Sequence, residues 1–260
     1  MKYLLPLILV IFLLPGVSPN ALAQEEITFL APRPVQGPID KLIKEFEAKT
    51  SYKVKATWDS GLGTKKLVAE GKQQDVSVMF SPFPDAVASG NVDKNSGQTL
   101  MKLVMALAVK KDMAKPDIST ADAVKKLLLS AKSIGTVDPA QGSVGVAAMA
   151  IFDRLGITEQ VKPKLKVYPT GAGPQTSVAN GEIEIALGPY VSDIRNPERI
   201  NLVGGLPESA STPTAVAGYI STQAKDSKAA KALLDFLTKS PEAVATYKEE
   251  RMAPGNGARP

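Results

Sequence analysis

Two short turns in the sequence place a hydroxyl and a glycine immediately before a helical pattern begins. They are Ser60-Gly61 and Gln141-Gly142-Ser143. The N-terminus of a helix carries free backbone N–H groups and the positive end of the helix dipole, and a hydroxyl beside it adds a further donor. Glycine permits the sharp bend that such a turn needs. We therefore expect both turns to bind a small anion.

A cationic side chain, Arg33, lies in a Pro-rich loop after the first predicted strand. A tetrahedral oxyanion can be held by neutral donors alone, whereas the planar guanidinium fork suits a carboxylate in a bidentate pair. If Arg33 faces the ligand, an organic acid is favoured. The alternative is a surface arginine whose aliphatic stem packs on the loop. Gln36 and Gln141 could donate hydrogen bonds to a second carboxylate.

Three residues are candidates for proton transfer if the protein is an enzyme. Asp59 could act as a base, Tyr190 could donate its hydroxyl to the ligand, and Lys65 could reach the ligand from the first turn of its helix. Each also has a structural explanation: an Asp before Ser-Gly fixes a turn, a Tyr packs on a cleft wall, and such a Lys is solvated. They form no recognisable catalytic set, so the catalytic residues stay open.

The composition excludes several classes of enzyme. The 260 residues include no His and no Cys, which removes Ser-His-Asp and Cys-His mechanisms and the usual ligands of a zinc site. We expect neither a metal nor another cofactor. The net charge of +5 favours anionic partners, but the lysines are scattered rather than clustered with aromatic residues. A small anion is therefore the expected partner, and nucleic acid is not.

The first 23 residues have the pattern of a cleavable secretory signal peptide. Lys2 precedes an apolar run over residues 3–17, which is short for a membrane span, and Ala21 and Ala23 form the small-residue cleavage pattern. The alternative, a retained membrane anchor, is disfavoured by the Pro and Gly residues in the run. Without Cys, the cleavage site cannot be that of a lipoprotein. We predict cleavage between Ala23 and Gln24 and release into the periplasm.

The remaining chain alternates short apolar strands with amphipathic helices, a pattern typical of parallel sheets covered by helices. The first series of strands is expected at 27–30, 54–58, 76–80 and 103–109, with helices that begin at 38, 64 and 84. The second series has a helix from 121 and strands at 133–137, 165–168, 183–187 and 202–204. Two such series predict two lobes.

The C-terminal segment indicates how the two lobes are joined. A Pro- and Ser-rich link over 206–213 leads to a strand at 215–220 and two helices, which are too few elements for a third domain. They are expected to pack on the first lobe, so the chain crosses between the lobes twice. The predicted organisation is a signal peptide over 1–23, a first lobe over 24–109 plus 215–260, and a second lobe over 110–214.

Six short motifs span essentially all of the chain that follows the signal peptide. They are Ile27-Thr28-Phe29-Leu30-Ala31, Phe46-Glu47-Ala48-Lys49-Thr50, Asp59-Ser60-Gly61, Gln74-Asp75-Val76, Asp138-Pro139-Ala140 and Asn180-Gly181-Glu182-Ile183-Glu184-Ile185-Ala186. In this order, they resemble the motifs of the molybdate-type periplasmic solute-binding proteins of ABC transporters.

This resemblance implies an α/β fold of the type II periplasmic-binding class. Such a fold has two lobes, each a mainly parallel sheet flanked by helices, with two hinge crossings and the ligand in the cleft between the lobes. It also implies a function, which is the capture of a small anion by a monomer that delivers it to the membrane subunits of an ABC transporter. The expected ligand-binding residues are Arg33, Gln36, Ser60, Gly61, Gln141, Gly142, Ser143 and Tyr190.

The sequence departs from the molybdate proteins proper at two places. The turn after the first strand, residues 31–36, lacks the Ser that those proteins carry, and Tyr190 is displaced along the chain from the position of their cleft Tyr. The ligand therefore stays open between an organic carboxylate and a molybdate-like oxyanion.

An enzyme on the same scaffold is the alternative function. Proteins that resemble this family include a periplasmic aconitate isomerase, which interconverts the cis and trans forms of a tricarboxylate. A shared fold does not decide between capture and turnover. The absence of a recognisable catalytic set favours capture.

Overall fold

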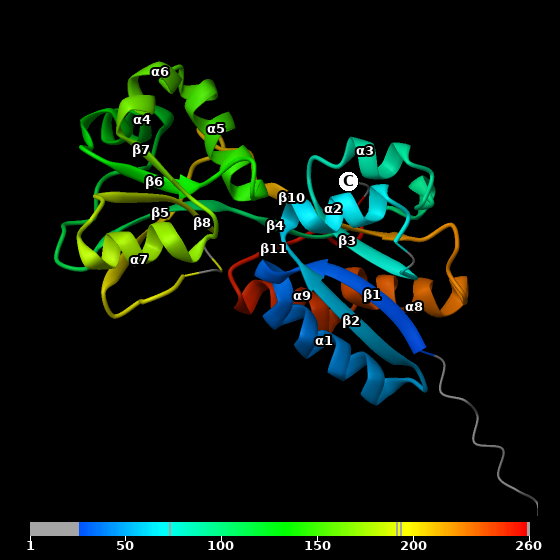
Figure 1. Cartoon of the computed structure of the whole chain (residues 1–260). Helices are drawn as coiled ribbons and strands as arrows, with labels where there is room; N and C mark the ends of the chain where they lie inside the picture. The colour runs from blue at the N-terminus through cyan, green and yellow to red at the C-terminus, as the bar shows by residue number, and fades with distance from the viewer. Residues whose placement is uncertain (1–25, 73, 191, 193, 259–260) are drawn as a thin grey trace, which may run out of the picture.

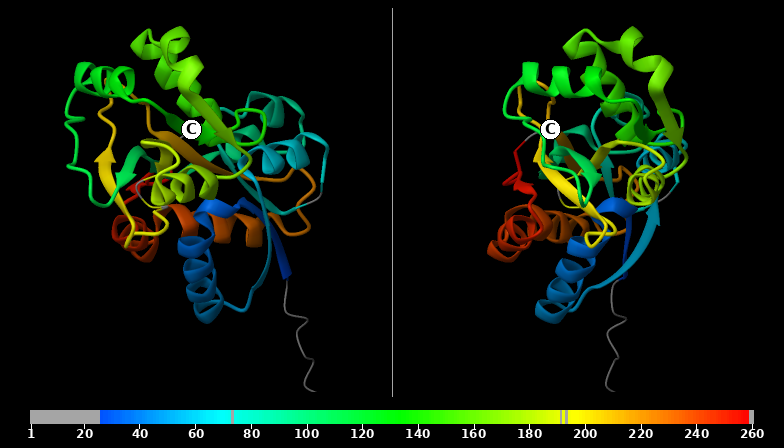
Figure 2. Two further views of the ribbon diagram at one scale, coloured as in Figure 1. Left: turned by 60° about the vertical axis from the view of Figure 1, so that its left-hand side comes forward. Right: turned by 90° about the vertical axis from the view of Figure 1, so that its left-hand side faces the viewer.

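The computed structural model describes residues 26–72, 74–190, 192 and 194–258 of the chain, and the predicted signal peptide lies outside them. Within these residues the strands form two separate sheets, one in each of two lobes (Figure 1). The fold is therefore the expected two-lobed α/β fold. Two groups of helices lie at opposite ends of the molecule in both views of Figure 2. One group is α4, α5 and α6, in green; the other is α1 in blue, α8 in orange and α9 in red.

The first sheet has the strand order β11-β4-β10-β3-β1-β2. Its central strand β3 has the sequence VSVMF and is buried throughout, as expected for a strand covered on both faces. The edge strand β2 instead alternates exposed and half-buried residues. The strands are β1 (Glu26–Pro32), β2 (Lys53–Asp59), β3 (Val76–Phe80), β4 (Gln98–Leu103), β10 (Thr214–Ile220) and β11 (Ala253–Pro254).

The second sheet has the strand order β7-β6-β8-β5-β9. Strands β6, β7 and β8 run parallel, and β5 pairs antiparallel with β8 and β9. The first sheet is mixed in the same way, because β10 runs antiparallel to β3 and β4. The strands of the second sheet are β5 (Met105–Lys110), β6 (Ile134–Val137), β7 (Leu165–Tyr168), β8 (Ile185–Tyr190) and β9 (Ile200–Gly205).

Helices cover both faces of each sheet (Figure 1). On the first sheet, α2 and α3 lie on one face and α1, α8 and α9 on the other; on the second sheet, α4, α5 and α6 lie opposite α7. The α-helices are α1 (Gln36–Lys49), α2 (Gly61–Ala69), α3 (Pro84–Ala88), α4 (Ala121–Ser130), α5 (Ser143–Leu155), α6 (Thr158–Val161), α7 (Ala172–Asn180), α8 (Ser227–Lys239) and α9 (Pro241–Glu249). Short 3-10 helices are η1 (Arg33–Val35), η2 (Lys94–Ser96) and η3 (Lys162–Lys164).

Local sequence signals explain where several helices begin and end. Thr120 and Ser240 cap α4 and α9, since each side chain accepts a hydrogen bond from the backbone N–H three residues further on. Gly156 and Gly181 end α5 and α7 with φ of 64° and 77°, in the left-handed region that glycine adopts without strain. Among the described residues, none of the helices is long and apolar enough to cross a membrane.

The chain passes from one sheet to the other at two places. The apolar run at 103–109 was expected to form one strand, but the structure splits it: β4 ends at Leu103 in the first sheet and β5 begins at Met105 in the second. The return crossing is the segment between β9 and β10. The two crossings lie side by side, because Leu206 N–H donates a hydrogen bond to the carbonyl of Met105 at 2.8 Å. On the outward crossing, Val104 is the residue that separates the strands of the two sheets.

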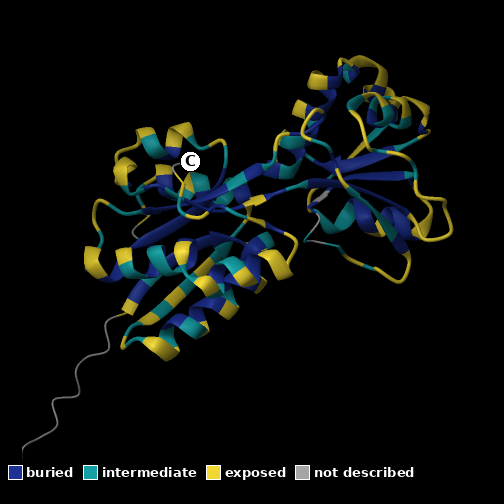
Figure 3. Ribbon diagram, turned by 180° about the vertical axis from the view of Figure 1, so that it is seen from behind, coloured by how far each residue is buried: buried dark blue, intermediate teal, exposed yellow. Residues whose placement is uncertain are grey.

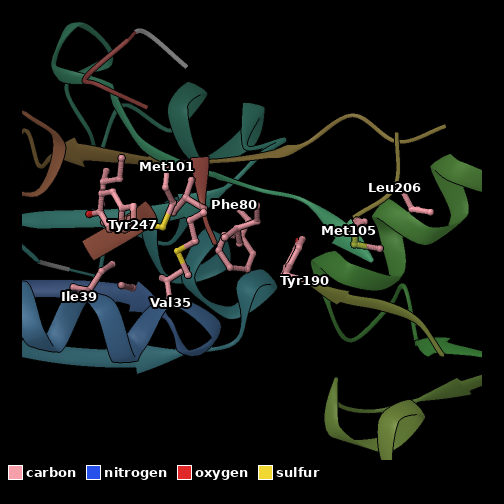
Figure 4. Close-up of a cluster of buried hydrophobic side chains, with 14 of the residues drawn as sticks. Val35, Ile39, Phe80, Met101, Met105, Tyr190, Leu206 and Tyr247 are labelled. Carbon is pink, nitrogen blue, oxygen red and sulfur yellow. The ribbon is translucent and has the colours of Figure 1, made fainter. Parts of the chain in front are cut away.

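A continuous apolar core links the two lobes at these crossings. Figure 4 shows side chains of this core from Tyr247 and Ile39 in the first lobe, through Phe80 and Tyr190, to Met105 at the start of β5 in the second sheet. The rings of Phe80 in β3 and Tyr190 in β8 meet edge to face, with their centroids 6.0 Å apart. Seen from behind, the strands of both sheets are mostly buried, and exposed residues lie on the outer helix faces and the loops (Figure 3).

Candidate functional site

A cavity of about 390 Å³ lies where the loops of the two sheets face each other. From the first sheet it is lined by residues after β1 and β2 and at the end of β3; from the second, by residues at or after the ends of β6, β7 and β8. All six are carboxyl ends of parallel strands. This is the edge at which α/β sheets bind ligands.

Three helix N-termini meet at this cavity. Its lining includes Ser60 and Gly61 at the start of α2, Gly142 and Ser143 at the start of α5, and Gly171 before α7. Each helix has nine or more residues, so each presents free N–H groups and a positive dipole end. The backbone alone therefore gives the cavity a positive potential that favours an anion.

The hydroxyl of Ser143 is buried at the cavity without a hydrogen-bond partner among the described residues. Ser143 is only 7% exposed and is the first residue of α5. A buried polar atom without a partner is costly in a native protein and usually marks a place for a ligand or water. The lining position of Ser143 indicates that its hydroxyl can donate to a bound ligand.

The turns at Gly61 and Ser143 approach each other across the cavity. A Cβ atom on Gly61 would lie 2.8 Å from Ser143 Oγ and 2.9 Å from Cδ2 of Phe80. These distances are shorter than a normal contact, so only glycine fits there without a shift of its neighbours. Gly61 thus lets the two lobes approach each other closely at this edge of the sheets.

Two arginines line the cavity, one from each lobe. Arg33 comes from η1 after β1, and Arg195 from the loop after β8. No hydrogen bond or ion pair from another described residue holds the Arg33 side chain. The backbone N–H of Arg195 donates to Gln175 Oε1 at 2.6 Å, which attaches its loop to α7. The described lining residues include no Asp or Glu, so their formal charge is positive.

This fold and cavity agree with the comparison to known proteins. The family model of bacterial extracellular solute-binding proteins matches residues 27–250. The chain belongs to this family.

Individual relatives of this solute-binding protein have two kinds of names. It is 28% identical over 226 residues to an aconitate isomerase from a Pseudomonas species, with 84% of each chain covered. It is 26% identical over 250 residues to the molybdate-binding protein ModA of Azotobacter vinelandii, with 92% and 94% of the two chains covered.

Among solved structures, the substrate-binding domain of a proposed molybdenum ABC transporter from Clostridium difficile shares the fold. The TM-score is 0.73 at 17% identity, with 88% of this chain and 98% of that chain covered.

Six of the residues expected at the site line the cavity of the solute-binding protein. They are Arg33, Ser60, Gly61, Gln141, Gly142 and Ser143. The remaining candidates lie elsewhere among the described residues. Gln36 is on α1, where its Nε2 donates to Asp40 Oδ2 at 3.2 Å. Tyr190 is buried in the core between the lobes, and its hydroxyl lies 3.3 Å from Thr214 Oγ1.

The other two proton-transfer candidates are also outside the cavity lining. Asp59 Oδ1 accepts a hydrogen bond from Ser60 N–H at 2.6 Å, the arrangement of a turn-fixing Asp. Lys65 Nζ donates to the carbonyl of Pro82 at 2.9 Å, in a separate groove between α2 and α3. Burial lowers the pKa of Lys65. These contacts explain both residues without a bound ligand.

Several lining residues were missed by the sequence analysis. Gly171 and Ala172 begin α7 after a predicted strand, and this strand-Gly-helix pattern matches the two turns that were selected. Phe80 and Gly188 are strand residues with no local sign of a site. Arg195 follows β8 in an irregular loop, and only the tertiary structure places it opposite Arg33.

Proposed function

We propose that this protein captures a small organic anion in the cavity between its lobes and delivers it to the membrane subunits of an ABC transporter. The observation that carries the proposal is the set of groups at the cavity: three helix N-termini, two arginines and the Ser143 hydroxyl, which has no hydrogen-bond partner among the described residues. No acidic side chain is described among the lining residues to oppose an anion. Membership of an extracellular solute-binding family supports the same function.

A carboxylate fits these groups better than a molybdate-like oxyanion does. Neutral N–H and O–H donors are enough for a tetrahedral oxyanion, but an arginine fork is matched to a planar carboxylate. The cavity also has an apolar wall from Phe80, Val137 and Val144, which a carbon skeleton can contact. In this proposal Arg33 pairs with a carboxylate, and Ser60, Gln141 and Ser143 add hydrogen bonds.

Capture would couple binding to closure of the lobes. The ligand contacts loops of both sheets, so it favours the arrangement in which they meet over any arrangement in which they are apart. The crossings at Val104 and 206–213 are the places where the lobes can turn relative to each other. We place the first lobe at residues 26–103 and 214–258 and the second at 105–205.

The predicted setting of this function is the periplasm. A signal peptide over residues 1–23, with cleavage between Ala23 and Gln24, would export the protein, which would act there as a monomer. The family's extracellular character supports this location.

An isomerase is a second candidate, because an aconitate isomerase is 28% identical over 84% of the chain. A cis-trans isomerisation of this kind needs a group that takes up and returns a proton. Asp59, Lys65 and Tyr190 are absent from the described lining and have other contacts. This placement favours capture over turnover.

A thermal-shift screen followed by NMR tests the two candidates. The protein without residues 1–23 is screened against molybdate, tungstate, sulfate, phosphate and a panel of di- and tricarboxylates. A ligand that binds only the folded state raises its melting temperature in a concentration-dependent way. We expect a shift with a carboxylate whose NMR spectrum stays unchanged. Conversion of cis- into trans-aconitate would instead establish the isomerase, and a shift with molybdate alone would exclude the organic ligand.

A further inference from the structure

We infer that Thr136 forms an inner subsite of the cavity, where its hydroxyl hydrogen-bonds a neutral O–H group in the liganded protein. That group is either a hydroxyl of the ligand or a water molecule that bridges to the ligand. Thr136 belongs to β6, directly before the lining residue Val137. The inference rests on the proposed function and specifies what its site binds in addition to the anionic group.

Buried hydroxyls without a partner lie at one place in the part of the chain that the structure describes. Only two buried side-chain polar atoms lack a hydrogen-bond partner there, Thr136 Oγ1 and Ser143 Oγ. Ser143 is the first residue of α5, and Thr136, which is fully buried, lies beside the next residue, Val144. An unpartnered buried hydroxyl costs free energy. One binding site at the start of α5 therefore explains the pair better than two independent faults in packing.

Gly188 marks the point at which Thr136 comes close to the cavity. It lines the cavity from β8, the strand that neighbours β6. A Cβ atom on Gly188 would lie 3.3 Å from Thr136 Oγ1 and 2.6 Å from Val144 Cγ1. A methyl group of Val144, another lining residue, thus uses the space that a side chain on Gly188 would take. Rotation of Val144 about its Cα–Cβ bond moves this methyl group and opens Thr136 to the cavity.

The surroundings of Thr136 favour a neutral O–H group over a charged one. Val144 Cγ1 and Met105 Cε lie 2.6 Å and 3.6 Å from the Cβ position on Gly188, so the hydroxyl has apolar neighbours. A charged group loses far more free energy than a hydroxyl does when it moves from water to such a place. The threonine hydroxyl both donates and accepts, as its partner O–H group does. The charge of the ligand is met instead by the helix N-termini on the cavity wall.

Close contact between α5 and the end of β6 holds this subsite in place. A Cβ atom on Gly145 would lie 2.3 Å from the carbonyl oxygen of Val137, so the helix approaches the strand more closely than any other residue permits. Thr136 and Val144 are the chain neighbours of these two residues. Because both belong to regular elements in contact, little ordering of the chain opposes binding.

Calorimetric titration of the wild type and of Thr136→Val tests the inference. The replacement nearly keeps the shape of the side chain and removes its hydroxyl. The probes are pairs of acids that differ by one hydroxyl, namely succinate and malate, glutarate and 2-hydroxyglutarate, and tricarballylate and citrate, together with sulfate and molybdate. Thr238→Val is the matched control, because Thr238 is a buried threonine of the first lobe whose hydroxyl donates to the Leu234 carbonyl at 2.7 Å.

We expect Thr136→Val to weaken binding about fivefold, the usual loss for one hydrogen bond. The free energy of unfolding without ligand, measured in urea, should stay the same or rise, because an unpartnered buried hydroxyl is removed. Thr238→Val should do the reverse, with lower stability and unchanged affinity, since its hydroxyl has a partner.

The acid pairs distinguish the two sources of the O–H group. If the ligand supplies it, the hydroxy acid binds the wild type more tightly than its partner acid, and Thr136→Val removes that difference. If water supplies it, Thr136→Val weakens both acids of a pair equally. Either result supports the inner subsite.

The failures of this inference and of the proposed function are distinguishable. Unchanged affinities in Thr136→Val would overturn the inner subsite while anion capture stands. Absence of binding by every probe would overturn both. Binding of sulfate or molybdate alone would overturn the organic ligand; a loss of that affinity in Thr136→Val would still support the subsite, and an unchanged affinity would overturn it as well.

Two further variants separate a hydrogen bond from a packing effect. Thr136→Ser keeps the hydroxyl and should bind as the wild type does; equal losses in Thr136→Ser and Thr136→Val would overturn the role of the hydroxyl. Val144→Ala removes the methyl groups beside Thr136, so the added Thr136→Val change should cost at least as much affinity as it does in the wild type. A smaller cost would show that Val144 does not cover the subsite.

Discussion

The two serine-glycine turns of this protein have the same composition but opposite order, and the order decides what each hydroxyl does. In Ser60-Gly61 the serine is the N-cap of α2, and its Oγ accepts a hydrogen bond from Gly63 N–H at 2.9 Å. In Gly142-Ser143 the glycine is the N-cap of α5, and the serine is the first residue of the helix.

The two serine hydroxyls at the cavity therefore have different roles. Ser60 uses one oxygen lone pair to stabilise its own helix, and its proton can still be donated to a ligand. Ser143 has no partner in the described structure, so both its donor and its acceptor are available. We expect the first turn to serve stability and binding, and the second to serve binding alone.

The contact between the turns gives the largest expected effect. Gly61→Ala places a Cβ atom against Ser143 Oγ and the ring of Phe80, so the turns can no longer meet without a shift. Anion affinity should fall by about 2 kcal/mol, roughly thirtyfold, the usual scale of overpacking. Calorimetric titration measures it, and Gly37→Ala is the control because nothing lies within 4 Å of that position. Wild-type affinity in Gly61→Ala would show that the bound form does not need this contact.

Ser143→Ala should weaken binding and leave the unliganded protein at least as stable. The change removes a donor to the ligand, which lowers affinity by about 1 kcal/mol, roughly fivefold. It also removes a buried hydroxyl that has no partner in the described part of the chain, so the free energy of unfolding should stay the same or rise. Urea unfolding without ligand, paired with titration, measures both. A less stable variant with unchanged affinity would assign Ser143 a structural role.

Ser60→Ala should show the opposite balance. Loss of the N-cap of α2 lowers the free energy of unfolding by about 1 kcal/mol. Ser60→Asp, which keeps the capping oxygen, should restore the stability but place a negative charge at the cavity and weaken anion binding. If Ser60→Ala is as stable as the wild type, the cap is not what distinguishes the two turns.

The smallest expected effect is that of low pH. Acid should lower the stability of the first lobe, through Asp235, before it weakens binding at the cavity. Burial raises the pKa of Asp235 on α8, but hydrogen bonds from Lys231, Lys239 and Gln98 outweigh it and lower the pKa to about 2. Because this pKa is below its usual value near 3.8, the stabilisation is complete above about pH 4 and is lost as the pH falls toward 2.

Asp235→Asn should flatten the fall in melting temperature between pH 4 and pH 2. The described lining of the cavity has no acidic group that acid could protonate. Binding at the cavity can be followed over the same pH range with sulfate, which stays anionic. An equally steep acid transition in the variant would show that other carboxylates control it.

Much of the fold was predictable because it depends on local patterns. The alternation of apolar strands with amphipathic helices gave the two β/α series, and the strand over residues 76–80 coincides with β3. The split of the run at 103–109 was not predictable, since Leu103 and Met105 are both buried and apolar and nothing local marks Val104 as a crossing.

For the candidate site, the sequence by itself determined the two turns that lead into a helix N-terminus. Ser60-Gly61 and Gln141-Gly142-Ser143 combine backbone N–H groups, a hydroxyl and glycine within a few residues, and that chemistry needs no distant partner. Arg33 was also found from its place directly after a strand, because the carboxyl ends of parallel strands meet at one edge.

Only the tertiary structure decided which other residues join them. Tyr190 and Phe80 are buried strand residues like their neighbours, and their meeting between the lobes depends on how two sheets pack. Arg195 and Arg33 are far apart in the chain and lie in different lobes, so no spacing relates them. Helix starts and strand ends are local properties of a sequence, whereas a cavity between two lobes exists only once both have folded and the crossings have set them face to face.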